Sequence, residues 1–292
     1  MAITADLVAS LVAEQFPQWR DLPVRPVARC GNDNRTFHLG DELLVRLPSA
    51  AGYAPQAERE YAWLPVLGPR LTLPIPAPLA QGRPTARYPF CFTINRYLPG
   101  EPATRDNVAD LGRFARDVAR FLVELQAIDP AGGPPAGAAN CFRGASLAVY
   151  DGETRRFLRA LADELPVGIL WDRWRQALGG PWRGPDVWLH GDVAPDNLLV
   201  DQGRLCAVID FGIMAVGDPA CDYALAWTFL DAPARGVFFE TVGCDQAAIA
   251  RGRGWALWKA VITYHDADCE RADNARYVID QILSEVHCQT RG

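Results

Sequence analysis

The sequence predicts an α+β protein in which a small, strand-rich N-terminal lobe precedes a larger, mainly helical lobe. Three observations support this prediction. Short apolar segments separated by polar turn residues crowd residues 24–47, as in antiparallel strands joined by tight turns. Residues 106–125 carry apolar side chains at helical spacing. Helical patterns also continue from residue 218 to the end of the chain. We therefore expect the lobes to comprise residues 1–97 and 98–292.

The first lobe is expected to hold most of the strands. Its opening segment, MAITADLVASLVAEQF, predicts an amphipathic helix and lacks the basic region of a signal peptide. VRPVARC and TFHL flank the polar loop GNDN, and ELLVRL follows a short turn, so all three are predicted strands. A helix over residues 54–67 carries Glu58 and Glu60. PIPAPLA is predicted to be extended, and FCFTINRY, residues 90–97, is predicted to be a strand that LPGEP ends.

The second lobe is expected to be helical around a few short strands. Asp106 is suited to capping its first long helix. Residues 129–140, DPAGGPPAGAAN, predict a flexible connection, and two helical patterns follow within residues 150–179. VWLH, NLLV and LCAVID are short apolar segments typical of buried strands. Asp218 followed by Pro219 suits the cap and first position of a helix.

The composition excludes several classes of protein. The chain has 292 residues, of which 49% are hydrophobic and 22% charged, as is usual for globular proteins. Its net charge of −6 argues against a nucleic-acid partner, and no apolar run approaches the roughly 20 residues of a membrane span. The eight Cys residues form no C-x-x-C pair, which favours reduced core cysteines over disulfides or zinc. We expect a cytoplasmic protein, either monomeric or a weak homodimer, without a membrane partner.

The stretch LHGDVAPDNLLV, residues 189–200, carries the strongest indication of function. Asp192 follows His190 by two positions, Asn197 follows Asp192 by five, and the triplet beginning at Asp210 follows Asp192 by 18. An H-x-D-x-x-x-x-N loop followed by a hairpin and D-F-G is the arrangement found in protein kinases. A polar turn formed by chance is the alternative, because turns use the same residue types. The ordered combination of the two motifs favours the catalytic interpretation.

Phosphoryl transfer explains why these residue types occur together. The reaction needs a carboxylate that aligns the attacking hydroxyl and accepts its proton, and Asp192 is suited to that role. It also needs Mg²⁺ to neutralise the nucleotide phosphates, and Mg²⁺ prefers hard oxygen ligands. Asn197 and Asp210 would supply one amide oxygen and one carboxylate. The rest of the catalysis is positioning and charge stabilisation.

Several stretches together resemble the aminoglycoside phosphotransferase family, a small-molecule branch of the kinase-like fold. The resemblance is carried by HGDVAPDNLLV, VIDFG and GDPACDYALAW, with Gly where protein kinases have the Arg of H-R-D. CGNDNRTFHLGDELLVRLP is similar to the family's nucleotide-loop hairpin and third strand, EREYAWLPVL to its helix C, and INRYLPGE to its interlobe linker. ARFLVELQAIDP is similar to its long core helix and RGRGWALWKA to a C-terminal helix. The resemblance implies a two-lobed, protein-kinase-like fold with a nucleotide-binding first lobe and a catalytic, substrate-binding second lobe.

The resemblance assigns roles to the motif residues of the second lobe. The catalytic base and the two metal ligands of the family match the residues already singled out: Asp192, Asn197 and Asp210. His190 is expected to brace the catalytic loop, or else to be a plain core histidine. Asp218 matches the first Asp of the family's GDP-x-x-D segment and is expected to cap a helix and hold the catalytic loop. Asp222, one turn later, is also expected to be structural.

In the first lobe, Arg46 occupies the place of the phosphate-binding Lys on the family's third strand. The basic residues of this half of the chain are all Arg, since the single Lys is Lys259. An Arg remains charged and binds phosphate through two hydrogen bonds; the alternative for Arg46 is a solvated strand residue. Glu60 is the expected ion-pair partner of Arg46, with Glu58 as the second choice.

The predicted nucleotide loop and linker carry weaker signals. GNDNRTF has one Gly instead of the three of G-x-G-x-x-G, so Asn32, Asn34 and backbone amides would have to cover the phosphates. An ordinary hairpin turn is the alternative. Backbone atoms near Asn95 and Tyr97 are expected to hydrogen-bond the nucleotide base, as linker backbones do in the kinase-like fold.

The resemblance implies transfer of the γ-phosphate of ATP or GTP to a hydroxyl of a small molecule, with Mg²⁺ as cofactor. An aminoglycoside antibiotic is the first choice of acceptor, which would make the protein a resistance enzyme. A macrolide, another natural product, or a metabolic alcohol or sugar is the alternative. A protein kinase is disfavoured because no A-P-E element follows D-F-G. A non-catalytic nucleotide-binding protein on the same fold is a further alternative, against which the intact motif residues argue.

The acceptor site is expected in the helical lobe. Between His265 and Glu285 six acidic residues stand against two Arg, and such a cluster could attract a polycation. Asp266, Asp268 and Glu270 are the candidate acceptor-binding residues, and a solvated acidic helix face is the alternative. The aromatic residues of this half either line an apolar pocket or belong to the core: Trp227, Trp255, Trp258 and Tyr264.

Overall fold

The computed structural model describes residues 2–28, 31 and 33–289, with side chains up to residue 285. The chain divides into two compact units. The N-terminal unit comprises Met1–Gly100 and Ala207–Gly212, and the C-terminal unit comprises Glu101–Cys206 and Ile213–Gly292. A sheet dominates the first unit and helices dominate the second, which confirms the predicted α+β class.

A five-stranded antiparallel sheet forms the centre of the N-terminal unit, with the strand order β1-β2-β3-β5-β4. Side chains of β3 alternate between the core and the opposite face, so Leu43, Val45 and Leu47 are buried in the core. Arg46 lies opposite Thr36 of β2 and Thr93 of β5. The strands are β1 Val24–Pro26, β2 Asn34–Leu39, β3 Leu43–Pro48, β4 Pro78–Gly82 and β5 Phe92–Arg96.

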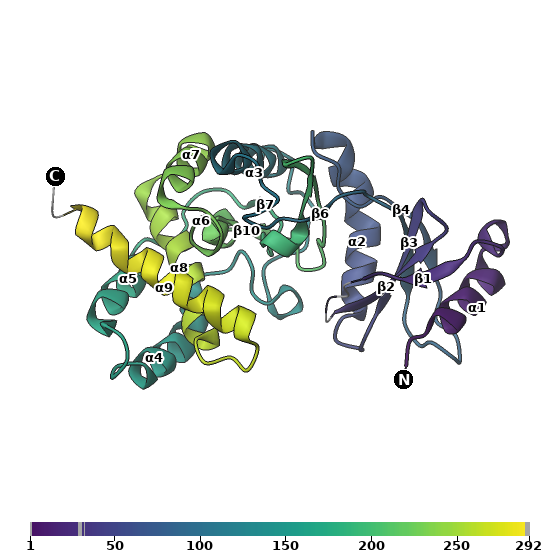
Figure 1. Cartoon of the computed structure of the whole chain (residues 1–292), viewed down its shortest axis with the longest axis horizontal. Helices are drawn as coiled ribbons and strands as arrows, with labels where there is room; N and C mark the ends of the chain where they lie inside the picture. Colours follow the sequence, from purple (N-terminus) through teal and green to yellow (C-terminus); the bar gives the residue numbers. More distant parts are fainter. Residues whose placement is uncertain (1, 29–30, 32, 290–292) are drawn as a thin grey trace. The chain divides into compact units, whose positions relative to one another are not determined.

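Two helices flank this sheet, α1 (Ala5–Gln15) and α2 (Ala54–Leu67), and they lie on opposite sides of it (Figure 1). The hydroxyl of Thr4 caps α1, and Val8, Leu11 and Val12 pack into the core of the sheet. The predicted range of the second helix is confirmed residue for residue. Short 3₁₀ helices follow both, at Pro17–Trp19 and Gly68–Arg70.

Part of the proline-rich segment is a strand. We expected PIPAPLA to be merely extended, but Pro78–Gly82 forms β4 at the edge of the sheet. An edge strand tolerates Pro because one side of it needs no ladder hydrogen bonds. The sequence signal is weak for the same reason, since proline normally counts against a strand.

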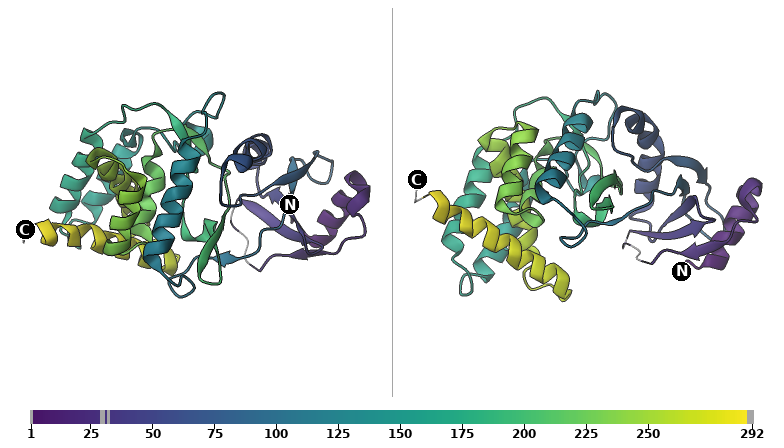
Figure 2. Two further views of the ribbon diagram at one scale, coloured as in Figure 1. Left: turned by 90° about the horizontal axis from the view of Figure 1, so that it is seen from above. Right: turned by 45° about the horizontal axis from the view of Figure 1, so that its top comes forward.

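The C-terminal unit is built around α8, which is buried on nearly all sides and contacts α4, α5, α6 and α9. Figure 2 shows α9 crossing the helices of this unit. A helix surrounded by other helices needs small and apolar residues on every face. The helices are α3 Leu111–Gln126, α4 Asp151–Ala160, α5 Val167–Gly179, α6 Leu225–Thr228, α7 Ala232–Val242, α8 Gln246–Thr263 and α9 Cys269–Gln289.

Short strands and 3₁₀ turns carry the polar motifs of this unit. β7 (Val187–Leu189) pairs antiparallel with β10 (Ala215–Gly217), a strand that the sequence did not predict. A second sheet has the order β6-β8-β9. Its strands are β6 Glu101–Pro102, β8 Leu198–Asp201 and β9 Arg204–Val208, and the 3₁₀ turns are Ala138–Asn140, Leu147–Tyr150, Pro195–Asn197 and Pro219–Ala224.

Two features of the C-terminal unit differ from the expectation: the start of its first long helix and the end of the segment 129–140. Asp110, and not Asp106, caps α3, because its carboxylate accepts a hydrogen bond from the backbone N–H of Arg113. The segment 129–140 ends in an ordered turn, since the amide of Asn140 bonds the backbone of Pro135 and Gly137. Both differences arise from side chain–backbone hydrogen bonds that a helical or compositional pattern does not show.

Asp151 ties α4 to α5 and makes stability depend on pH. Its carboxylate accepts hydrogen bonds from the indole of Trp174 at 2.8 Å and from Arg155 at 2.7 Å. Burial alone would raise the pKa of Asp151, but these two donors outweigh it and hold the pKa below its usual value. A lowered pKa contributes stability above the unfolded pKa of about 3.9, and this contribution is lost as the pH falls through the folded pKa.

We predict that Asp151→Asn lowers the free energy of unfolding near pH 7 and that the gap to the wild type closes below about pH 4. Urea unfolding at a series of pH values measures the gap. Asp172→Asn, which removes an exposed carboxylate on α5, is the control. A difference in the free energy of unfolding that stays constant over this pH range would contradict the role assigned to Asp151.

Candidate functional site

The N-terminal unit contains a compact ionic cluster of Arg46, Glu60 and Asp210. Nη1 of Arg46 donates to both carboxylate oxygens of Glu60, at 2.9 and 2.8 Å. Its Nη2 donates to Oδ1 of Asp210 at 2.9 Å. The side chains of Arg46 and Glu60 are 12% and 4% exposed, whereas that of Asp210 is 39% exposed. The cluster thus presents one carboxylate to solvent and buries the ion pair beneath it.

The local fold explains why Glu60, and not Glu58, contacts Arg46. The buried residues of α2 follow helical spacing and include Gln56, Glu60 and Leu64, whereas Glu58 is exposed. Arg46 lies on the face of β3 opposite the apolar core residues. An acidic residue on the buried face of α2 is therefore the one that meets Arg46.

The segment from Asp210 to Gly212 is fixed to α2. The backbone N–H of Phe211 donates to Glu60 at 3.0 Å, and Arg59 donates to the carbonyl of Gly212. Asp210 has φ +65°, a left-handed conformation that Asp adopts more readily than most residues but that still stores strain. Contacts on both sides of Asp210 hold this conformation, so its carboxylate has a fixed direction.

Arg46 remains a cation in this cluster. Burial alone would lower the pKa of Arg46, but the charges of Glu60 and Asp210 outweigh burial and raise the pKa. A guanidinium has five N–H donors, and the hydrogen bonds of Arg46 to Glu60 and Asp210 use three of them. The second N–H of Nη2 and the Nε–H are therefore the donors that a phosphate group could use.

We predict that Glu60→Gln lowers the free energy of unfolding by about 2 kcal/mol, because Arg46 loses a charged acceptor in a buried setting. Glu58→Gln, two residues away and exposed, should change it by less than about 0.5 kcal/mol. Thermal and urea unfolding of both variants test the difference. If the two substitutions changed the free energy of unfolding equally, the ion pair of Glu60 with Arg46 would contribute nothing specific to stability.

The structure describes three of the four remaining candidate nucleotide-binding residues of the first lobe. Asn34 is buried at the start of β2, and Asn32 falls outside the described residues. Asn95 is buried on β5, and its Oδ1 accepts no hydrogen bond from the described residues. The backbone N–H of Tyr97 already donates to the carbonyl of Glu42 at 2.7 Å. That N–H is therefore unavailable to a nucleotide base.

The catalytic loop of the C-terminal unit begins where β7 ends. Gly191 has φ +87°, and a Cβ there would lie 2.4 Å from the carbonyl oxygen of Ile213, so the position requires glycine. The carboxylate of Asp222 accepts hydrogen bonds from the backbone N–H groups of His190 and Gly191, both at 2.8 Å. Nδ1 of the buried His190 accepts a hydrogen bond from the N–H of Asp192 at 3.1 Å. His190 and Asp222 together set the course of the loop.

Asp192 and Asn197 face each other on this loop. Nδ2 of Asn197 donates to the backbone carbonyl of Asp192 at 2.9 Å and to its carboxylate Oδ2 at 3.2 Å. Asp192 is exposed and Asn197 is buried. Because Nδ2 is fully used, the Oδ1 of Asn197 is the atom left to act as an acceptor or a metal ligand. Asp196, which lies between them in the sequence, is exposed.

The structural roles of Asp218 and Asp222 differ from those that we expected. Asp218 caps the 3₁₀ turn at Pro219–Ala224, as expected, and forms a buried ion pair with Arg251 at 2.7 Å. Burial raises the pKa of Asp218 although Arg251 opposes the shift. The carboxylate that holds the catalytic loop is that of Asp222. The spacing of these two residues cannot reveal which of them reaches the loop.

The acidic candidates gather at the start of α9. Asp268 accepts hydrogen bonds from the backbone N–H groups of Glu270 and Arg271, and Asp266 accepts one from the N–H of Asp268. Arg271 also lies 3.8 Å from each of these two aspartates. Two of the three carboxylates are therefore occupied in a helix-capping turn. Among the aromatic candidates Trp227, Trp255 and Trp258 are buried, and Tyr264 is half-buried.

Sequence reasoning missed Arg143, which braces the catalytic loop from outside. Its Nε donates to the carbonyl of Gly191 at 2.8 Å. The guanidinium lies over the rings of Trp255 at 5.0 Å and Trp258 at 5.3 Å. No motif marks this residue, because it belongs to an irregular loop far from the catalytic loop in sequence.

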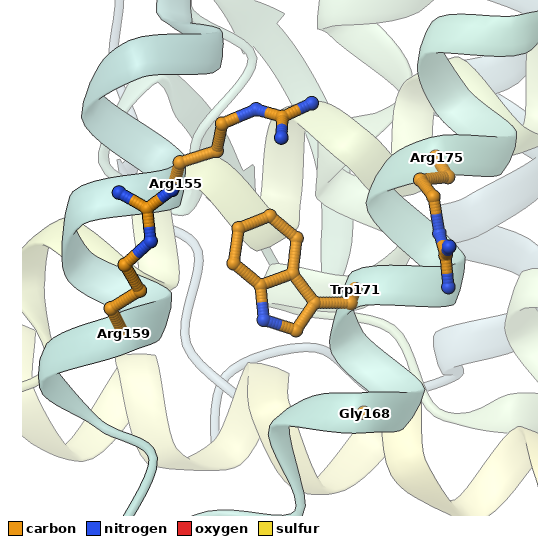
Figure 3. A pocket seen from close by; sticks show the side chains of 5 residues that line it. All are labelled: Arg155, Arg159, Gly168, Trp171 and Arg175. Carbon is orange, nitrogen blue, oxygen red and sulfur yellow. The ribbon is translucent and has the colours of Figure 1, made fainter.

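A shallow pocket of about 380 Å³ lies between α4 and α5 and holds none of the predicted site residues. Figure 3 shows the ring of Trp171 between the arginines of the two helices. Two of these arginines are already paired, Arg155 with Asp151 and Arg175 with Asp172. The pocket is lined by Arg155, Arg159, Gly168, Trp171 and Arg175.

The described residues also show what the chain offers to metal ions, to thiol chemistry and to membranes. No group of three or more His, Cys, Asp or Glu residues is placed to hold a metal ion within the described part of the chain. The described cysteines are free thiols, but the expected core placement holds only for Cys221, since Cys141 and Cys269 are exposed and Cys91, Cys206 and Cys244 are half-buried. No described helix is both long and apolar enough to cross a membrane.

Residues 24–259 match the phosphotransferase enzyme family, and the chain belongs to that family. The uncharacterized protein YcbJ of Bacillus subtilis is 34% identical over 90 residues, which cover 30% of this chain and 28% of that protein. The aminoglycoside 3'-phosphotransferase of Escherichia coli is 35% identical over 65 residues, which cover 22% of this chain and 23% of that protein. These matches thus span less than a third of either relative.

Solved structures show the same fold over the whole chain. The GDP complex of wild-type aminoglycoside 2'-phosphotransferase-IIIa has a TM-score of 0.73 at 18% identity, covering 97% of this chain and 99% of that chain. The macrolide 2'-phosphotransferase MphH from Brachybacterium faecium has a TM-score of 0.59 at 23% identity, covering 94% and 97%. The predicted kinase-like fold and the resemblance on which it was based are confirmed.

Proposed function

We propose that the protein transfers the γ-phosphate of ATP or GTP to a hydroxyl group of a small molecule. The observation that carries the proposal is the pairing of Asp192 with Asn197 on one loop, in a chain that belongs to a phosphotransferase family. The side chain of Asp192 is exposed to solvent, its carboxylate accepts a hydrogen bond from Asn197, and its backbone N–H donates to His190. A non-catalytic nucleotide-binding protein would not need this arrangement.

In the proposed reaction Asp192 is the catalytic base. Its carboxylate accepts a hydrogen bond from the acceptor hydroxyl, aligns the oxygen with the γ-phosphorus and takes the proton as the P–O bond forms. Asn197 holds the carboxylate through Oδ2. Most of the rate enhancement then comes from positioning, which the fixed backbone of Gly191 and Asp222 provides.

The N-terminal unit is proposed to bind the nucleotide. Arg46 would contact its phosphates, with Glu60 fixing the guanidinium, and Asn34 and the backbone around Asn95 and Tyr97 would lie along the nucleotide. The N–H of Tyr97 already donates to the carbonyl of Glu42, so the nucleotide base would bond other backbone groups of the linker. We place the protein in the cytoplasm, where both nucleotides are available, as a monomer or weak homodimer.

Mg²⁺ is the proposed cofactor, with Asn197 and Asp210 as its ligands. The residues fit that ion, because each offers a hard oxygen: Oδ1 of Asn197, whose Nδ2 is engaged elsewhere, and the half-exposed carboxylate of Asp210. One or two protein oxygens suffice for Mg²⁺, which completes its shell with phosphates and water. When bound, the ion neutralises phosphate charge during transfer.

The names of the relatives make aminoglycosides the first class of acceptor to test and macrolides the second. The protein is incubated with Mg²⁺, ATP or GTP and a panel of aminoglycosides, macrolides, sugars and other alcohols. Mass spectrometry then detects addition of one phosphate. Modification of at least one acceptor is expected. The absence of a phosphorylated product throughout a broad panel would overturn the proposal.

A second measurement separates the enzyme from a nucleotide-binding scaffold. The melting temperature is recorded with ATP and with GTP, each with and without Mg²⁺. A ligand that binds only the folded state raises the melting temperature, and we expect the larger rise with the metal present. Nucleotide binding without metal dependence and without turnover would favour the scaffold.

A further inference from the structure

The surroundings of Asp192 in the C-terminal unit are cationic and aromatic. Lys259 on α8 lies within electrostatic reach of Asp192, Arg143 and Asp266. Its side chain is exposed, and its ammonium has no hydrogen-bond or ion-pair partner among the described residues. It is the one lysine of the sequence, and it comes directly after Trp258.

Arg143 supplies a second cation beside the same loop, and it is hydrogen-bonded to the side chain of Tyr150. Its Nε is used by the carbonyl of Gly191, but its Nη1 is buried and makes no hydrogen bond to any described residue. A buried donor without a partner is costly. The guanidinium lies over two tryptophans, and the ring of Tyr150 stacks on Trp258 with centroids 3.9 Å apart. Aromatic faces and unpaired donors therefore meet near the base.

The nearby carboxylates are engaged elsewhere. Asp266 lies beside Arg271 and accepts a backbone hydrogen bond. Glu153 accepts a hydrogen bond from the indole of Trp258 at 2.8 Å. Neither is hydrogen-bonded to Lys259. The positive charges of Lys259 and Arg143 would thus repel a polycationic acceptor that approaches Asp192, whereas they would attract an anionic group.

We propose that Lys259 and Arg143, with the half-buried ring of Tyr150 that stacks on Trp258, form an acceptor subsite for a molecule that carries an anionic group next to an aromatic or apolar part. This inference rests on the proposed function, because it assigns the acceptor to the side of Asp192 where the subsite lies. It disfavours aminoglycosides and favours an acidic natural product or metabolic alcohol. Although Lys259 is exposed overall, partial desolvation of its ammonium, and after it the charge of Arg143, lowers the pKa of Lys259, and a bound anion would offset that shift.

Binding to the subsite can be measured without phosphate transfer. Reductive ¹³C-methylation of the full-length protein labels Lys259 and the N-terminal amine alone, since the chain has a single lysine, and methylation keeps the charge. The probes are three aryl glucosides that share one sugar and one ring: 4-carboxyphenyl β-glucoside, phenyl β-glucoside and 4-(aminomethyl)phenyl β-glucoside. Each is titrated while the methyl signal of Lys259 is followed by NMR, and unlabelled binding is followed by calorimetry.

The anionic probe should shift the Lys259 signal saturably and bind about fivefold more tightly than the neutral probe, with the cationic probe weakest. In calorimetry Lys259→Gln should reduce this preference to less than twofold, and Lys259→Arg should retain it. Arg159→Gln on α4 removes one positive charge from a different surface and should leave the preference unchanged.

Two results would overturn the inference. One is equal affinity for the three probes, or no movement of the Lys259 signal with the anionic probe. The other is an equal loss of affinity for all probes in Lys259→Gln, which would give the residue a general structural role. Charge-selective binding through Lys259, combined with no transfer to any acceptor, would instead refute the proposed reaction and leave the anion subsite standing.

Discussion

Asp192→Asn should lower the turnover of phosphate transfer by about 10²–10⁴-fold, the usual contribution of a general base. The substituted amide can still accept a hydrogen bond through its oxygen, but it cannot take the proton of the acceptor hydroxyl. The loop should keep its shape, because Asn197 also bonds the backbone carbonyl at position 192 and Asp222 holds His190 and Gly191. The expected loss is therefore in kcat, measured with saturating nucleotide and the best acceptor of the panel.

Asp196→Asn is the matched control for this change. Asp196 lies on the same loop and is exposed, and its side chain has no assigned role, so the variant should keep nearly full activity. The rise in melting temperature with Mg²⁺ and nucleotide should be the same for both variants and the wild type. Near-normal turnover of Asp192→Asn would show that another group is the base.

Local spacing was sufficient to predict that Asp192 pairs with Asn197 and Arg46 with Glu60, but not that Arg46 also contacts Asp210. Five positions separate Asp192 from Asn197, and the 3₁₀ turn at Pro195–Asn197 brings the amide back onto the carboxylate. The helical period of α2 places Glu60 on its buried face and Glu58 on its exposed face. In both cases the spacing of residues within a single turn or helix sets where the side chain lies, so its position can be predicted from the sequence.

Long-range hydrogen bonds could not be predicted in the same way. Arg143 reaches Gly191 across 48 positions, and Asp222 reaches it across 31. Neither contact follows from periodicity or from a motif, since each depends on how irregular loops pack. The same holds for Tyr97, whose backbone N–H is taken by a neighbouring strand end. Acceptor chemistry depends on such contacts, and for this reason the sequence indicated the reaction better than the substrate.

Gly191→Ala should destabilise the C-terminal unit by about 3 kcal/mol or more and abolish turnover. The left-handed φ of +87° already costs a residue with a Cβ about 1–3 kcal/mol. The added methyl would also lie 2.4 Å from the backbone oxygen of Ile213, which cannot rotate away as a side chain can. To relieve the clash the loop must shift, and with it the N–H groups that Asp222 holds and the carboxylate of Asp192.

Urea unfolding followed by tryptophan fluorescence reports this effect, because all but two of the nine tryptophans, Trp19 and Trp63, lie in the C-terminal unit. Gly236→Ala on α7 is the control, since a Cβ there meets nothing within 4 Å and alanine stabilises a helix interior by about 0.5–1 kcal/mol relative to glycine. The two substitutions add the same methyl group and should change stability in opposite directions. A Gly191→Ala variant with wild-type stability but no turnover would mean that the loop tolerates the methyl by moving Asp192 alone, so that rigidity of this backbone serves catalysis and not folding.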